Sequence, residues 1–128
     1  MILLDTDVMI DLLRQYLPAV IWLGAIGEEE IALPGFVAME LILGCRNKAE
    51  QEKMERELRN YAIVWPSPAT CNEALSVFAS HHLSHGIGII DMLIGQTAVA
   101  LNVPLYTFNR KHYVAIPKLK TVQPYEKR

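Results

Sequence analysis

Residues 89–98 read Ile-Ile-Asp-Met-Leu-Ile-Gly-Gln-Thr-Ala and contain one charged side chain, Asp91. The apolar residues around it predict a helix over 89–101 that is buried on most sides. The neighbours of Asp91 one helical turn away are all isoleucine or glycine, so no cation on this helix can pair with the carboxylate. A carboxylate that is buried without a partner is costly. The sequence therefore predicts that a distant part of the chain, or a ligand, meets Asp91.

Short apolar runs alternate with helical stretches along the whole chain. Asp7 is the expected N-cap of the first helix, Asn102 is the expected stop of the last, and residues 125–128 are expected to fray. This order predicts an α/β fold with a mainly parallel five-stranded sheet flanked by helices, in a single domain over residues 1–128. We expect strands over 1–5, 31–33, 61–65, 103–107 and 119–122, and helices over 8–15, 18–26, 36–43, 47–60, 69–83 and 89–101.

The composition indicates a compact domain without a strong charge bias. Hydrophobic residues make up 52% and charged residues 20%, which argues against disorder. The formal net charge of −2 gives no global signal for nucleic acid. The two cysteines, Cys45 and Cys71, do not suggest a disulfide framework, and a reducing compartment, the cytoplasm, is expected. No signal peptide is expected, and no apolar run reaches the ~18 residues of a membrane span.

Two further acids share the unusual setting of Asp91. Glu40 is the single acid in a long apolar stretch, and Asp5 stands at the end of the first expected strand. Asn109 follows the fourth strand. Because ligands bind at the carboxyl ends of parallel strands, we expect these side chains to meet at that edge of the sheet.

Each acid also has an ordinary explanation when it is taken alone. Glu40 could be a solvated helix residue, Asp5 could end a strand or cap a helix, and Asp91 could face a helix dipole. Three converging carboxylates would repel one another. A divalent cation with a preference for hard oxygen ligands, Mg²⁺ or Mn²⁺, removes that conflict.

Four motifs follow one another along the chain. They are Leu-Leu-Asp-Thr-Asp-Val-Met-Ile-Asp-Leu-Leu (3–13), Val-Ala-Met-Glu-Leu-Ile-Leu-Gly (37–44), Ile-Ile-Asp-Met-Leu-Ile-Gly-Gln-Thr-Ala (89–98) and Leu-Tyr-Thr-Phe-Asn-Arg-Lys-His-Tyr (105–113). In these motifs and their order the chain resembles the PIN-domain family, and specifically the VapC-type toxins of bacterial and archaeal toxin–antitoxin modules. The resemblance implies a three-layer α/β domain with Mg²⁺- or Mn²⁺-dependent endoribonuclease activity on RNA. It also implies a homodimer and a cognate antitoxin protein that inserts a segment into the active-site groove.

The resemblance also implies roles for individual residues. The family's invariant acids map onto Asp5, Glu40 and Asp91, which are thereby implied to hold the metal. The fourth family position, often Asp, falls on Asn109, and Thr107 matches the hydroxyl residue that accompanies it. Since an amide brings no charge, we expect one well-held metal and no tight second site.

Local cations would have to contact the RNA, because the net charge is slightly negative. If a metal masks the three site acids, 11 acids remain against 12 basic side chains, which gives a net charge of +1. Ordinary surface cations are the alternative interpretation of the basic residues near the motifs. The candidate RNA contacts are Arg46, Lys48, Arg110 and Lys111.

Histidines give weaker signals. His81 and His85 have a spacing that zinc ligands use on helices, but no cysteine cluster accompanies them, and a polar helix end is the preferred interpretation. The resemblance implies that His112 falls on a family position that packs or hydrogen-bonds locally near the groove.

Two alternative functions remain open at this point. The run Asp5-Thr6-Asp7 also fits the start of haloacid-dehalogenase-like phosphatases, although Met9 stands where those enzymes have Thr or Val. The second alternative is a degenerate PIN fold that binds RNA or a protein without catalysis. A metal-dependent cleavage assay separates this non-catalytic fold from a nuclease.

Overall fold

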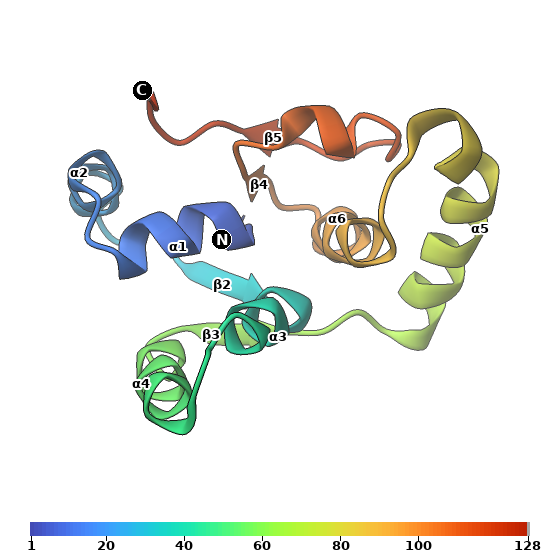
Figure 1. The fold of residues 1–128 in the computed structure, drawn as a ribbon. Helices are drawn as coiled ribbons and strands as arrows, with labels where there is room; N and C mark the ends of the chain where they lie inside the picture. Colours follow the sequence, from blue (N-terminus) through green and yellow to red (C-terminus); the bar gives the residue numbers. More distant parts are fainter. Residues whose placement is uncertain (128) are drawn as a thin grey trace.

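The computed structural model describes residues 1–127 (Figure 1). Five strands form one sheet in the order β3-β2-β1-β4-β5, and every neighbouring pair is parallel. The predicted α/β class and the helix-flanked, five-stranded parallel sheet are confirmed. The elements are β1 Ile2–Leu4, α1 Thr6–Leu13, α2 Leu17–Ala25, β2 Ile31–Pro34, α3 Gly35–Leu43, α4 Lys48–Leu58, β3 Ala62–Val64, α5 Pro68–His85, α6 Ile89–Leu101, β4 Leu105–Tyr106, the 3₁₀ helix η1 Arg110–Tyr113, and β5 Thr121–Val122.

The central strands form because their apolar side chains are buried on both faces of the sheet. Leu3, Leu4, Ala32, Leu33 and Leu105 are all fully buried. Continuous apolar runs are typical of parallel strands that helices cover on both sides. The same residues belong to one hydrophobic core together with apolar side chains of α1, α3 and α6.

The strand order reverses direction at β1, and this reversal positions the candidate site. The chain passes from β1 to β2 and β3 on one side, and β4 then lies on the other side of β1. The register pairs Leu4 with Tyr106, so the next residues, Asp5 and Thr107, leave the sheet side by side. Such a switch point is where parallel α/β sheets bind ligands.

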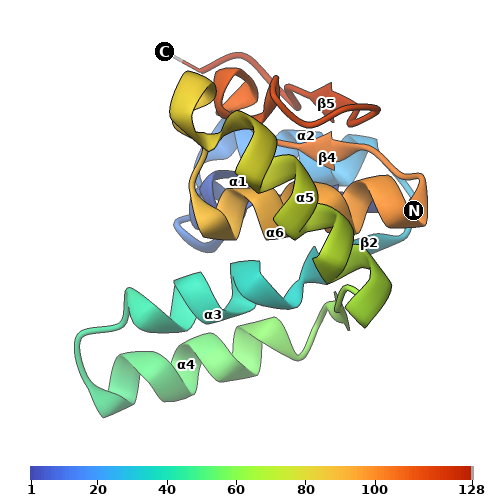
Figure 2. The ribbon, with the colours of Figure 1, turned by 90° about the vertical axis from the view of Figure 1, so that its right-hand side faces the viewer.

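The helices pack in pairs around the sheet. In both views α3 and α4 lie side by side, and α5 packs against α6 (Figures 1 and 2). Gly95 on α6 lets η1 approach closely, because an added Cβ would collide with Ile116 and lie 3.4 Å from Cδ1 of Tyr113. Within residues 1–127 no single helix is long and apolar enough to cross a membrane; α1 and α2 reach that length only together, bent by 104°.

The first helix begins two residues earlier than the sequence predicts. Asp5, and not Asp7, is the N-cap of α1, and its Oδ1 accepts a hydrogen bond from the Thr6 amide at 2.8 Å. The prediction for Asp7 was wrong because an aspartate at either position can accept a hydrogen bond from a nearby amide. Asp5 takes the cap position because it directly follows β1 and α1 begins at the next residue. The Asn102 stop is confirmed, with a left-handed φ of 55°.

Other element ends also differ from the prediction. Helix α5 extends to His85, where Gly86 adopts a left-handed φ of 63° and ends it, so residues 84 and 85 are not loop. Strands β4 and β5 contain two residues each, shorter than expected. Pro104, which has no amide hydrogen, precedes β4 and limits its ladder.

The C-terminal residues 125–127 pack against the domain, whereas the sequence predicts that they fray. The Tyr125 hydroxyl donates to Oδ2 of Asp11 at 2.8 Å, and Nζ of Lys127 lies 3.0 Å from the same oxygen. The Tyr125 ring also contacts Trp22 and Phe108. These long-range contacts explain the difference from the predicted tail. Residue 128 lies outside the described residues.

Candidate active site

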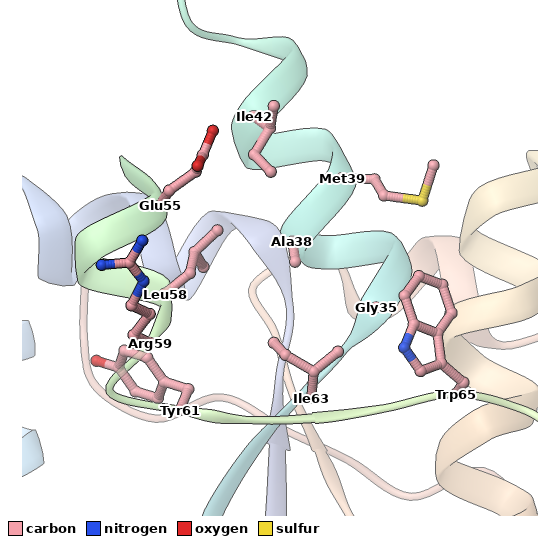
Figure 3. Close-up of a pocket in the computed structure, with 10 residues that line it drawn as sticks. All are labelled: Gly35, Ala38, Met39, Ile42, Glu55, Leu58, Arg59, Tyr61, Ile63 and Trp65. Atoms are coloured by element: carbon pink, nitrogen blue, oxygen red, sulfur yellow. The ribbon is translucent and has the colours of Figure 1, made fainter. Parts of the chain in front are cut away.

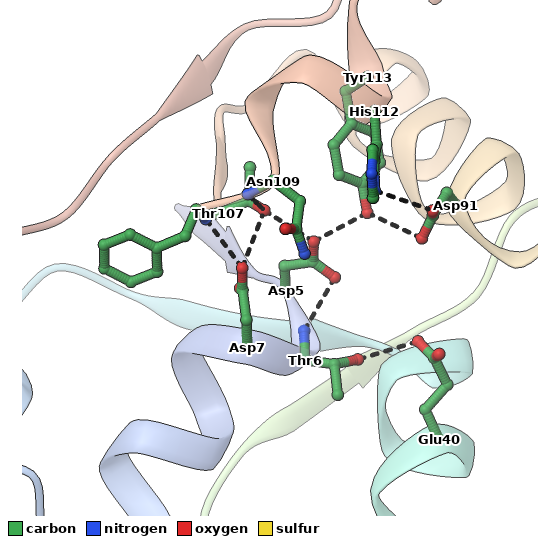
Figure 4. Close-up of polar contacts among 10 residues, drawn as sticks. Asp5, Thr6, Asp7, Glu40, Asp91, Thr107, Asn109, His112 and Tyr113 are labelled. Atoms are coloured by element: carbon green, nitrogen blue, oxygen red, sulfur yellow. Dashed lines mark hydrogen bonds and ion pairs between the residues drawn. The ribbon is translucent and has the colours of Figure 1, made fainter. Parts of the chain in front are cut away.

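Asp5 stands at the centre of the polar network at the sheet edge (Figure 4). It is only 4% exposed. Its Oδ1 accepts from the Thr6 amide at 2.8 Å, and its Oδ2 accepts from Oγ1 of Thr107 at 2.8 Å and from the hydroxyl of Tyr113 at 2.9 Å. An ionised carboxylate has about four lone-pair positions. Three are used here, so the carboxylate is firmly oriented and one position on Oδ1 stays open.

Asp91 faces Asp5 from the first turn of α6. Its Oδ1 lies 3.4 Å from the Tyr113 hydroxyl, and its Oδ2 lies 3.9 Å from Nδ1 of His112. Burial raises the pKa of Asp91, and the negative charge of Asp5 raises it further. The distant partner that the sequence predicts for Asp91 is therefore the η1 segment. The resemblance places His112 near the groove, and in the structure it lies beside Asp91, 21 residues away in sequence.

Glu40 reaches the same edge from α3. Its Oε1 accepts a hydrogen bond from Oγ1 of Thr6 at 2.9 Å. Burial is the main cause that raises the pKa of Glu40, the Thr6 hydrogen bond opposes this, and the charges of Asp5 and Asp91 add to it. The three acids thus act on one another electrostatically, although Glu40 is turned toward Thr6 (Figure 4).

The donor chemistry fits a divalent cation. In the arrangement of residues 1–127, no three His, Cys, Asp or Glu side chains already lie close enough to hold a metal ion. The charge of Asp5 nevertheless raises the pKa of both Glu40 and Asp91, and a cation would remove this repulsion. Carboxylate oxygens are the ligands that Mg²⁺ and Mn²⁺ prefer. The three acids therefore remain the candidate metal ligands.

The metal-free protein should gain stability from these acids as the pH falls from neutral. Burial raises the pKa of Glu40 and of Asp91 in the folded state, so the folded protein binds protons at a pH where the unfolded chain does not. Protonation then favours folding until the pH reaches the ordinary carboxyl range near about 4. Thermal melts in EDTA should show a smaller rise in melting temperature with falling pH for the Glu40→Gln, Asp91→Asn double variant than for the wild type. The same pH dependence in both proteins would contradict a contribution of these two acids.

Asn109 and Thr107 lie where the sequence predicts. Thr107 is fully buried, and besides bonding Asp5 its Oγ1 accepts from the Asn109 amide at 3.0 Å. The Asn109 side chain is exposed and points toward Asp5 (Figure 4). An uncharged oxygen and two amide hydrogens therefore stand at the rim of the site.

Asp7 links two distant segments, a structural role that the sequence did not predict. Its Oδ1 accepts from the Val8 amide at 2.8 Å, and its Oδ2 accepts from the Phe108 amide at 2.9 Å. These bonds join the start of α1 to the chain after β4. A phosphatase of the haloacid-dehalogenase type needs this second aspartate for chemistry, whereas here both oxygens are occupied by backbone amides.

The candidate RNA-binding cations fall into two groups. Arg46 and Lys48 precede or begin α4, and they pair with Glu50 and Glu52, four residues on. Arg110 and Lys111 lie in η1, directly after Asn109. Only the second group lies in η1, the segment whose His112 and Tyr113 approach Asp91.

Comparison with known proteins gives the family. The model of the PIN domain matches residues 2–117. The chain belongs to the PIN-domain family. This PIN domain is 32% identical over 122 residues to Ribonuclease VapC10 of Mycobacterium tuberculosis, covering 94% of this chain and 91% of that protein. It is 31% identical over 123 residues to Ribonuclease VapC19 of the same organism, covering 92% of this chain and 96% of the relative.

Solved structures share the fold of this PIN domain. A chain of a toxin–antitoxin complex from Klebsiella pneumoniae superposes with a TM-score of 0.78 at 24% identity, covering 99% of this chain and 100% of that chain. A chain of VapBC2 from Rickettsia felis, bound to a promoter DNA fragment, has a TM-score of 0.78 at 26% identity, covering 95% and 98%.

Proposed function

We propose that this PIN domain is a VapC-type toxin, an endoribonuclease that hydrolyses RNA phosphodiester bonds with Mg²⁺ or Mn²⁺. The observation that carries this function is that Asp5, Glu40 and Asp91, from three distant segments, approach one edge of the sheet closely enough for the charge of Asp5 to raise the pKa of the other two. The 32% identity to a ribonuclease over nearly the whole chain supports nuclease chemistry at these acids.

Each residue then has a definite task. Asp5, Glu40 and Asp91 would hold the cation, which on binding supplies a more acidic water and neutralises charge on the phosphoryl oxygens. Asn109 offers an uncharged amide to a water or to the RNA backbone at the rim. Thr107 fixes the orientation of the Asp5 carboxylate through its 2.8 Å hydrogen bond. Arg110 and Lys111, which follow Asn109 in η1, would contact the phosphates of the RNA.

The test is cleavage of structured RNA by the purified protein. We expect cleavage with Mg²⁺ or Mn²⁺, none in EDTA, and recovery when excess Mn²⁺ is added. Equal cleavage in EDTA would overturn metal dependence. Binding of RNA without cleavage under every divalent cation would favour the non-catalytic PIN fold.

A groove beside the acids suits an antitoxin segment, and we propose that the cognate antitoxin inserts there. The groove has a volume of about 580 Å³ and extends to Thr6 and Glu40. A peptide in it would bury apolar side chains while its end approached the acids. The similar folds of chains from solved toxin–antitoxin complexes support this partner. The apolar lining comes from helices α1 to α4 and from Tyr61, which lies between α4 and β3; it includes Ile10, Leu13, Leu23 and Met54.

A second apolar surface supports the proposed homodimer. Side chains of α3, of the end of α4 and of the β3 region line a hollow (Figure 3). Met39 is 58% exposed there and Trp65 is 57% exposed. Exposed apolar surface of this kind marks protein–protein contact sites. A second copy of the chain would bury it.

Met39→Glu is expected to convert the dimer to a monomer, because moving a new charge from water into the contact costs desolvation free energy. Light scattering coupled to gel filtration measures this as a halved mass. Leu101→Glu is the control, since Leu101 is also an exposed apolar residue, 43% exposed, but lies at the end of α6 and outside the hollow. A wild-type monomer, or a dimer that survives Met39→Glu, would contradict this interface.

We also propose a cytoplasmic location. Within residues 1–127 both cysteines, Cys45 and Cys71, are free thiols. Free thiols are typical of proteins in reducing compartments.

A further inference from the structure

Tyr113 places a hydroxyl between two of the site acids. The residue is 2% exposed, and η1 holds it against α6 where Gly95 permits the approach. Its hydroxyl lies 2.9 Å from Oδ2 of Asp5 and 3.4 Å from Oδ1 of Asp91 (Figure 4). Burial, together with the neighbouring negative charges, raises the pKa of the phenol, so the hydroxyl keeps its proton at neutral pH.

We propose that the Tyr113 hydroxyl is a positioning group. It lies between Asp5 and Asp91 in the metal-free protein, and it competes with an incoming divalent cation for the oxygens of these acids. This role rests on the proposed function, because it assumes that these acids bind a cation. Tyr113 would then set how tightly the metal is held, without itself being a ligand.

Among the described residues, few cationic groups compensate the negative charges of Asp5 and Asp91. Within residues 1–127, no Lys or Arg forms an ion pair with Asp5 or Asp91. His112 lies 3.9 Å from Oδ2 of Asp91, and its charge opposes the rise in the pKa of that acid, as the Tyr113 hydrogen bond also does. The Tyr113 hydroxyl differs from His112 because it contacts both carboxylates.

The same bond limits what Asp5 can offer to a cation. Tyr113 and Thr107 together occupy both lone-pair positions of Oδ2. An oxygen that accepts two hydrogen bonds is a weaker ligand than a free one. Removal of the phenol oxygen should therefore have two opposite effects: the metal-free protein loses stability, and the cation binds more tightly.

Tyr113→Phe deletes this oxygen alone, and Tyr125→Phe is its matched control. Tyr125 also donates to a buried aspartate, Asp11, at 2.8 Å, but away from the site acids. Both variants should melt at lower temperature than wild type in EDTA. Calorimetric titration with Mn²⁺ should show about tenfold tighter binding to Tyr113→Phe, the equivalent of one hydrogen bond to a charged group. Tyr125→Phe should bind Mn²⁺ like wild type.

The possible results separate this inference from the proposed function. If wild type and Tyr113→Phe bind Mn²⁺ equally well, or the variant binds it less well, the inference is overturned and the function stands. If neither protein binds Mn²⁺, both are overturned. Should Tyr113→Phe fail to fold, the wild-type protein still gives a test: Mn²⁺ should perturb its near-ultraviolet tyrosine absorption, and an unchanged spectrum at saturating Mn²⁺ would overturn the inference.

Discussion

Asp91→Asn is expected to reduce metal-dependent RNA cleavage by at least about 100-fold, beyond the range typical of residues that only support metal ligands. The asparagine keeps the size of the side chain, and its oxygen can still accept from Tyr113. It removes the negative charge that a cation needs from the first turn of α6. Because Asp91 is only partly buried, the fold should persist. Cleavage rates with Mn²⁺, together with circular dichroism, measure both parts of this result.

Asp11→Asn provides the control for charge removal. Asp11 is a more buried aspartate on α1, and it contacts Tyr125 and Lys127 and not the site acids. This variant should cleave RNA at close to the wild-type rate when both are compared below their melting temperatures. Full activity in Asp91→Asn, or an equal loss in both variants, would remove Asp91 from the site.

Asp5→Asn should destabilise the metal-free protein by about 1–3 kcal/mol, the usual result of disrupting buried hydrogen bonds. Two effects oppose each other here. Neutralisation relieves repulsion, but the new amide hydrogens face Thr107 and Tyr113, which both donate to Oδ2 in the wild type. Because Asp5 is 4% exposed and its Oδ2 accepts two hydrogen bonds that water cannot readily replace, we expect the lost hydrogen bonds to dominate. Thermal melts in EDTA should show a fall of roughly 3–10 °C.

The same variant should lose the rise in melting temperature that Mn²⁺ gives to the wild type through binding to the folded state. Asp7→Asn separates a metal ligand from a structural acid. It should also be less stable, because Oδ2 of Asp7 accepts from the Phe108 amide, but it should keep most of the Mn²⁺ effect. If Asp5→Asn retains the full Mn²⁺-dependent rise, Asp5 has only a structural role.

The fold could be predicted because its signals are local. Apolar runs such as Ile2–Leu4 alternate with amphipathic or apolar helices, and this pattern alone indicates a parallel sheet covered by helices. Asn102 ends α6 as predicted because it tolerates a left-handed φ. The docked C-terminus could not be predicted, since it depends on contacts of Tyr125 with Asp11, 114 residues away.

The site could be predicted only in part, because some of its contacts join residues that are far apart in sequence. Lone acids in apolar surroundings, such as Glu40 and Asp91, are visible in a sequence because a buried charge needs an explanation. Tyr113 looks like one more core aromatic residue. Its hydroxyl acquires a role only when Gly95 brings η1 onto α6, beside an acid that lies 108 residues earlier.

Calorimetric titration with Mn²⁺ of the wild type and of Glu40→Gln tests most directly whether three acids share one cation. Glu40 is the informative position, because its carboxylate bonds Thr6 and is linked to Asp5 and Asp91 only through charge. Glu30→Gln is the control, because Glu30 is exposed and precedes the amino end of β2, at the opposite edge of the sheet from the site. We expect one site in the wild type and in Glu30→Gln, and binding at least about tenfold weaker in Glu40→Gln. Unchanged affinity in Glu40→Gln, or no Mn²⁺ binding to the wild type, would contradict a shared metal site.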